Sequence, residues 1–116
     1  MQPSEDDLES LWDMRKAIQR IQSFTTGASE TDYLANVMLQ SAVERQLEIL
    51  GEAAKRVSIN FQREHPEVDW RNTIGLRNVI AHQYERVEQD KIWRIVQTVL
   101  PDFLVLVETF LPPIED

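Results

Sequence analysis

Cysteine is absent from this chain, and glycine and proline are scarce, with three and five copies among 116 residues. Without cysteine the chain can form neither disulfides nor thiolate metal sites, and we expect a reducing, cytoplasmic compartment. No apolar run approaches the roughly 18 residues that a membrane helix needs, and residues 1–7 are too acidic and polar for a signal peptide. The length predicts a single domain over residues 1–116.

Positive charge is also scarce, and it is unevenly distributed. The formal net charge is -8, which by itself argues against nucleic-acid binding because phosphates would be repelled overall. Residues 70–94 nevertheless hold five basic residues against three acidic ones, a net charge of +2. We therefore predict a weak nucleic-acid contact surface made of Arg71, Arg86, Lys91 and Arg94. The alternative is that these are ordinary solvated charges on two helices.

Apolar residues recur at spacings of three and four along most of the chain, which predicts an all-α fold. A first helix should begin after a Ser4 cap, with Asp7 in the position of a capping-box partner. It should stop near Gly27, because glycine readily adopts the left-handed backbone conformation that ends many helices.

The second predicted helix is long and apolar. It is capped by Ser29 or Thr31 and should run to about Arg63, because His65 precedes Pro66 and a residue before proline disfavours helical geometry. Its apolar face is so wide that we expect this helix to be central and buried on two sides.

Two more helices complete the expected fold. A third helix, capped by Asp69, should run over residues 70–84, and a turn at 85–87 should lead into a fourth. Pro101 must kink or split the fourth helix, because proline lacks the amide hydrogen and crowds the previous turn. The sequence therefore predicts a four-helix up-down bundle whose last helix is kinked or split.

The apolar stripes of the last two helices exceed what one small bundle needs to bury, so we predict a homodimer. The residues on these stripes are Trp70, Ile74, Ala81, Val99, Phe103, Leu106 and Phe110. The alternative, which is the commoner use of such stripes, is that they face only the intramolecular core.

The polar run at residues 77–84, Arg-Asn-Val-Ile-Ala-His-Gln-Tyr, interrupts the apolar pattern, and such interruptions often mark function. On a helix with 100° per residue, Arg77 and His82 point about 140° apart, so one helix does not bring both onto one phosphate. A twofold pairing of two copies would place the Arg77 of one near the His82 of the other. Alternatively, the helix loosens near His82.

The side chains of this run suit metal-free cleavage of RNA. His82 can take the proton from a ribose 2'-hydroxyl or give one to the leaving oxygen. The guanidinium of Arg77 can grip phosphate oxygens and stabilise the charge of the transition state. Asn78 can orient the imidazole or donate to phosphate, and Tyr84 can donate a hydrogen bond or stack on a base.

Two alternatives to catalysis stay open. In one, the run is a helix-end cluster in which Arg77 pairs with Glu48 or Glu52 and His82 caps carbonyl groups. In the other, the protein is a non-catalytic helical module that binds a nucleotide or a nucleotidyltransferase partner between its helices.

Two further polar residues, Glu52 and His65, are candidates for a role near the run. Glu52 is expected either to orient the side chains of the run or to pair with Lys55 or Arg56 as ordinary surface charge. His65 is expected to be an exposed loop residue without a role in the site. No metal-ligand spacing is visible, and no cofactor is expected.

The run at 77–84 resembles the signature of the HEPN superfamily, specifically its HepT branch of toxin ribonucleases. Residues 47–54, Leu-Glu-Ile-Leu-Gly-Glu-Ala-Ala, are similar to the family's Gly-Glu-Ala segment on its second helix. Trp93 and the Leu-Pro pair at 100–101 are similar to its last-helix pattern. The resemblance extends over essentially the whole chain.

This resemblance implies a homodimer with a composite active site built from both copies of the run. It implies metal-independent RNA cleavage, with Arg77 and His82 as the catalytic pair and tRNA as one candidate substrate. It also implies a toxin of a type VII-like toxin–antitoxin pair, whose partner is an MntA-like nucleotidyltransferase antitoxin that adenylylates Tyr84. The added phosphates would put negative charge where substrate phosphate must approach Arg77.

Overall fold

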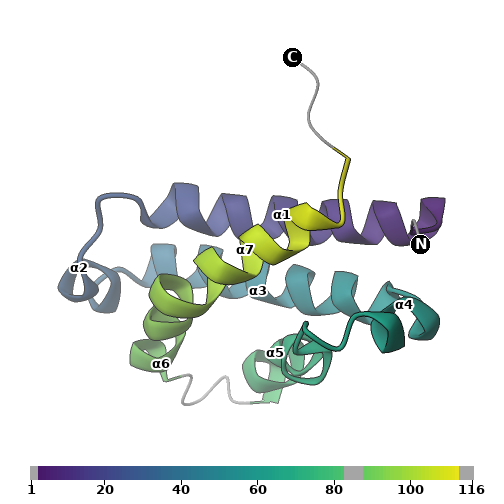
Figure 1. Cartoon of the computed structure of the whole chain (residues 1–116). Coiled ribbons are helices and arrows are strands. Elements are labelled where there is room, and N and C mark those ends of the chain that lie inside the picture. The colour runs from purple at the N-terminus through teal and green to yellow at the C-terminus, as the bar shows by residue number, and fades with distance from the viewer. Residues whose placement is uncertain (1–2, 83–87, 113–116) are drawn as a thin grey trace.

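The computed structural model describes residues 3–82 and 88–112, and the side chains of all of these except 77–82. The elements in chain order are α1 (Glu5–Thr25), α2 (Glu30–Leu34), α3 (Val37–Arg56), α4 (Ile59–Glu64), α5 (Trp70–His82), α6 (Gln89–Arg94), the π-helical turn η1 (Ile95–Val99) and α7 (Leu100–Thr109) (Figure 1). All regular structure in these described ranges is helical, which confirms the all-α prediction.

The ends of α1 confirm the predicted helix signals. Ser4 Oγ accepts a hydrogen bond from the Asp7 amide at 3.1 Å, and Gly27 has a φ of 81° just beyond the last turn. The Asp7 carboxylate does not close a capping box. It accepts instead from Ser58, from the amide at 2.8 Å and from the hydroxyl at 2.7 Å, and so ties α4 to the start of α1.

The single second helix predicted from the sequence is wrong: this stretch forms α2, α3 and α4. Ser29, rather than Thr31, caps α2, and its capping box is completed by Asp32. Asn36 caps α3 through its side-chain oxygen, which accepts from the Leu39 amide at 3.0 Å. A third polar cap, Ser58, starts α4. The breaks occur because each cap satisfies amides that a continuous helix would have bonded internally.

The last helical segment is split, as Pro101 predicts. The chain widens into η1 directly before α7, and Pro101 occupies the first turn of α7, where a missing amide hydrogen costs least. The wider turn accommodates the proline ring, which would crowd the carbonyl of the previous turn in a regular α-helix.

Helix α3 lies at the centre of the fold. It runs antiparallel to α1 (Figure 1), packs against α1 and α5, and α7 also packs on α1. The fully buried side chains of this core include Leu11, Met14, Ile18, Ile21, Val43, Leu47, Leu50 and Val107. The prediction that this part of the chain is buried on two sides is therefore confirmed for α3. In the described part of the chain, no helix is long and apolar enough to span a bilayer.

Candidate functional site

Helix α5 carries the first part of the polar run, and its start is strongly fixed. The side chain of Asp69 accepts from the amide of Asn72 at 3.2 Å and from its side-chain nitrogen at 2.7 Å. The hydroxyl of Thr73, which is buried, donates to the Asp69 carbonyl at 2.7 Å. The predicted Asp69 cap is thus confirmed, and α5 begins at Trp70 as expected.

The structure places Arg77, Asn78 and His82 on one continuous α-helix, because α5 extends to His82. Residues 83–87 lie outside the described residues, so the alternative in which the helix loosens near His82 stays a prediction. On regular helical geometry Arg77 and His82 are about 140° apart around the axis and about 7.5 Å apart along it. The side chains of these three residues, Tyr84 and the predicted turn at 85–87 lie outside the described residues.

One stripe of α3 carries three carboxylates. Glu44, Glu48 and Glu52 follow one another at four-residue spacing, and all three are partly buried. Glu48 pairs with Arg45 at 3.4 Å. Arg56, one of the surface partners considered for Glu52, pairs instead with Asp13 of α1 at 2.9 Å. Glu52 lies next to the buried Gly51, within the segment that resembles the family pattern.

A polar contact that the sequence did not suggest fixes the start of α6, the helix that follows the polar run in the sequence. The Tyr33 hydroxyl donates to Gln89 Oε1 at 2.7 Å, and Gln89 Nε2 donates to Glu44 Oε2 at 3.3 Å. Burial, and then the charge of Glu44, raises the pKa of the Tyr33 phenol. No local signal could have found this contact, because Tyr33 and Gln89 are 56 positions apart.

The predicted basic surface is only partly available. Arg71 and Arg94 are exposed, whereas Lys91 pairs with Glu88 across one turn. The hydrogen bond from Lys91 to Glu88 raises the pKa of the lysine, so it stays charged but neutralised by its partner. Arg86 lies outside the described residues.

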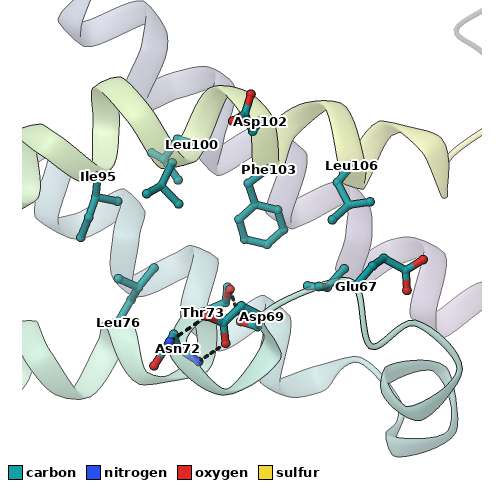
Figure 2. Close-up of a pocket in the computed structure, with 12 residues that line it drawn as sticks. Glu67, Asp69, Asn72, Thr73, Leu76, Ile95, Leu100, Asp102, Phe103 and Leu106 are labelled. Atoms are coloured by element: carbon teal, nitrogen blue, oxygen red, sulfur yellow. Dashed lines mark hydrogen bonds between the residues drawn. The ribbon is translucent and has the colours of Figure 1, made fainter.

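An open groove of about 400 Å³ separates the first half of α5 from η1 and α7 (Figure 2). Its apolar lining is Val68, Leu76, Ile95, Val99, Leu100, Phe103 and Leu106. Carboxylates of Glu67, Asp69 and Asp102 stand at its edges. Apolar walls with acidic edges would repel a polyanion, so this groove does not suit RNA. It suits an apolar face of a protein.

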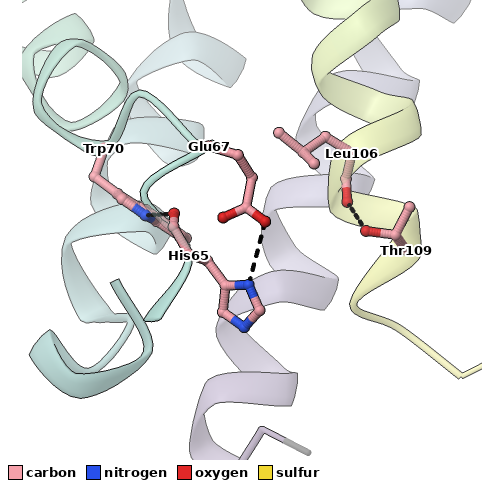
Figure 3. A network of polar contacts seen from close by, with 5 residues as sticks. All are labelled: His65, Glu67, Trp70, Leu106 and Thr109. Atoms are coloured by element: carbon pink, nitrogen blue, oxygen red, sulfur yellow. Dashed lines mark hydrogen bonds and ion pairs between the residues drawn. The ribbon is translucent and has the colours of Figure 1, made fainter. Parts of the chain in front are cut away.

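His65 is not the exposed loop residue that the sequence suggested. Its ring stacks between Phe61, with centroids 4.3 Å apart, and Phe110, at 4.6 Å. Its Nδ1 lies 3.5 Å from a Glu67 oxygen (Figure 3). The cause is the turn after α4, which folds the imidazole back onto the end of α7. His65 is therefore partly buried among two phenylalanines and one glutamate, with 24% of its side chain exposed.

Trp70 also differs from its prediction as a dimer-stripe residue. It is buried within the chain, meets Phe61 edge-on, and donates its indole hydrogen to the His65 carbonyl at 2.9 Å (Figure 3). The intramolecular alternative holds for this residue because the turn at 65–69 supplies a partner for its one polar atom. Of the other stripe residues, Val99 is half exposed.

Comparison with known proteins identifies the family. A family model described as "Ribonuclease HepT-like" matches residues 14–110, which include the whole polar run. "Probable ribonuclease HepT" of Thermococcus cleftensis is 37% identical over 78% of this chain and 83% of its own length. Two Methanocaldococcus jannaschii proteins, "Putative RNase MJ1380" and "Putative RNase MJ0127", are 32% and 30% identical. The first match covers 78% of this chain and 84% of the relative, and the second covers 97% and 93%.

The chain therefore belongs to the HepT-like ribonuclease family, which confirms the resemblance found in the sequence. No solved structure matches the chain significantly. The names of these relatives describe ribonucleases.

Proposed function

We propose that this protein is a metal-independent RNA endonuclease whose catalytic residues are Arg77 and His82. The observation that carries the proposal is that both residues, with Asn78 between them, belong to one continuous helix in a chain of the HepT-like ribonuclease family. A guanidinium, an amide and an imidazole are the groups that phosphodiester cleavage needs when no metal takes part.

The active site is proposed to need two copies of the chain. Because α5 stays helical through His82, one helix directs Arg77 and His82 about 140° apart. A homodimer to which each protomer contributes its α5 lets the Arg77 of one protomer face the His82 of the other across a twofold axis. The apolar groove beside α5 offers the second copy a surface to bury.

In the proposed reaction His82 removes the proton of a ribose 2'-hydroxyl, and the freed oxygen attacks the neighbouring phosphorus. The bond from phosphorus to the 5'-oxygen breaks, and that oxygen takes the proton back from the same His82 imidazolium, so each site uses one imidazole. Arg77 holds the phosphate oxygens while negative charge grows on them. Asn78 and Glu52 support the site by orienting the imidazole and the guanidinium.

The proposed regulation makes this protein the toxin of a type VII-like toxin–antitoxin pair. Its partner is an MntA-like nucleotidyltransferase that transfers an adenylyl group from ATP to Tyr84. The phenol oxygen attacks the α-phosphorus, pyrophosphate leaves, and the phenol proton passes to solvent. Tyr84 is two residues from His82, so the added phosphate would repel an incoming RNA phosphate.

A direct test measures cleavage of total RNA and tRNA by the purified protein in the presence of EDTA, from pH 5 to 9. We expect cleavage by the wild type and none by His82→Ala. The matched control is His65→Gln, which changes the chain's other histidine and should keep activity once folding has been verified. Wild-type protein that leaves RNA intact throughout this range would contradict the proposal.

The second candidate is a non-catalytic module that binds a nucleotide or a nucleotidyltransferase. It is favoured by the net charge of -8 and by the carboxylates around the groove. Growth arrest on expression of the wild type, compared with His82→Ala, separates the two, because only the nuclease should be toxic through His82. Mass spectrometry after co-expression with the neighbouring gene tests the adenylylation of Tyr84. Inhibition with an unmodified Tyr84 would reject adenylylation and favour simple blockade.

A further inference from the structure

Three described residues outside the catalytic run fix the start of α6, which follows the run in the sequence. They are Tyr33 of α2, Glu44 of α3 and Gln89 of α6, which we call the Gln89 clamp. Both ends of the Gln89 amide are bonded: its oxygen accepts from Tyr33 at 2.7 Å, and its nitrogen donates to Glu44 at 3.3 Å. Tyr33 is completely buried, so its hydroxyl could not be left unpaired without cost.

The bonding direction within the clamp is fixed by chemistry. The phenol must donate and the carboxylate must accept, so the group between them must be uncharged and offer an acceptor on one side and a donor on the other, as the Gln89 amide does. Burial, followed by the charge of Glu44, raises the pKa of Tyr33, and the phenol therefore stays a donor at any physiological pH. A carboxylate in place of Gln89 would face the carboxylate of Glu44.

The start of α6 depends on this clamp because it lacks a capping side chain of its own. Its N-cap residue, Glu88, makes no side-chain capping bond, whereas its last residue continues directly into η1. The clamp therefore acts on the first turn of a helical segment that runs on through η1 into α7. Gln89 is the first residue of α6, and one turn later Trp93 packs on the Tyr33 ring with centroids 5.2 Å apart. The same tyrosine thus holds α6 by a hydrogen bond and by ring packing.

The clamp is joined to the proposed active site by a short piece of chain. His82 ends α5, which packs against α3, and Gln89 begins α6, which the clamp bonds to α3 through Glu44. The helix before residues 83–88 and the helix after them are therefore both attached to α3. Resting on the function proposed above, we propose that Tyr33, Glu44 and Gln89 are positioning residues of the nuclease site, which set where the end of α5 and the start of α6 stand relative to each other.

Tyr33→Phe tests this proposal with little disturbance of packing, because it removes only the hydroxyl. Displacement of a catalytic group by about 1 Å can cost up to roughly a hundredfold in rate, and we expect kcat to fall about tenfold with KM within about twofold. The matched control is Thr25→Val, which removes another buried hydroxyl that bonds a carbonyl at 2.8 Å, at the far end of α1. That variant should lose similar stability and keep kcat.

Gln89→Glu adds a readout that a merely structural residue would not give. The new carboxyl must hold a proton to bridge Tyr33 and Glu44, so cleavage by this variant should recover toward the wild-type rate as pH falls to about 5 and decline as pH rises. Gln62→Glu is the control, because Gln62 bonds a backbone carbonyl of Val57 rather than a carboxylate. Its pH profile should match that of the wild type.

The outcomes separate this proposal from the function on which it rests. A wild-type protein that cuts no RNA overturns the nuclease and the positioning role together. An active wild type whose Tyr33→Phe variant loses only as much kcat as Thr25→Val, and whose Gln89→Glu variant keeps the wild-type pH profile, overturns the positioning role alone. A selective loss of kcat in Tyr33→Phe together with a shifted pH profile in Gln89→Glu supports it.

Discussion

The two long antiparallel helices, α1 and α3, and the α5–α6 region are held in place by different forces. Between α1 and α3 the contact is made by fully buried apolar side chains such as Met14, Ile18 and Leu47. Hydrogen bonds fix the start of α5, where Asn72 donates to Asp69, and the start of α6, where Gln89 accepts from Tyr33 and donates to Glu44. Apolar burial stabilises without direction, whereas hydrogen bonds fix orientation. Trp70 of α5 and Ile92 of α6 are also buried in the common core, so the hydrogen bonds add a fixed orientation to helices that apolar packing already attaches.

The largest expected effect is a loss of catalytic activity from a substitution in α5, with stability unchanged. Arg77→Lys should lower kcat/KM by roughly a hundredfold to a thousandfold, because an ammonium cannot replace the two parallel donors of a guanidinium on a phosphate. Arg71→Lys, the same exchange one and a half turns earlier on α5, is the control and should stay near wild type. Cleavage assays under single-turnover conditions measure both, and equal rates for both variants would count against a bidentate role for Arg77.

The second-largest effect should be a loss of folding stability, from a substitution in the α1–α3 core. Leu50→Ala removes a fully buried side chain of α3 and should lower the free energy of unfolding by about 2–5 kcal/mol. Leu34→Ala, at a position 47% exposed in α2, should cost far less. Urea denaturation followed by circular dichroism measures the difference. Similar losses for the two leucines would mean that the core is not where we place it.

A smaller loss of stability is expected when the polar link between α1 and α4 is removed. Asp7→Ala removes the acceptor of two bonds from Ser58 and leaves a partly buried amide without a partner, which should cost about 1–3 kcal/mol. Asp6→Ala, at the exposed neighbouring position, is the control. Thermal unfolding curves that coincide for these two variants would show that the link between α1 and α4 contributes nothing.

The smallest effect is a pH dependence from Tyr33. Its folded pKa is raised by burial and by Glu44, so its contribution to stability is fully present below about pH 10, the unfolded value. That contribution is lost as pH rises above this value, because the unfolded phenol ionises first. Tyr33→Phe should therefore show a shallower loss of stability between about pH 9 and pH 11 than wild type. Parallel curves in that range would contradict the assignment.

The sequence predicted what depends on local chemistry. Ser4, Asp69 and Pro101 act where they stand in the chain, and the structure confirms the two caps and the split they imply. The long second helix was wrong because its apolar spacing is continuous, while Asn36 and Ser58 break it as caps. Both are typical N-cap residue types, so the breaks could have been predicted.

Contacts between distant segments could not be predicted in this way. The stacking of His65 between two phenylalanines and the bonds of Gln89 depend on how α4, α6 and α7 are arranged in space. The polar run was recognised from its residue types, and the family match supports that choice. The pairing of Arg77 with His82 stays a prediction, because it depends on a second copy of the chain.

Mixing two inactive variants tests the composite site most directly. Arg77→Ala and His82→Ala protomers, purified separately and then exchanged, would form heterodimers in which one of the two sites has an intact Arg77 and an intact His82. If each site takes its guanidinium from one copy and its imidazole from the other, we predict that activity recovers to roughly a quarter of wild type, since about half of the dimers are mixed. A mixture as inactive as its two components, with exchange verified by native mass spectrometry, would contradict the account.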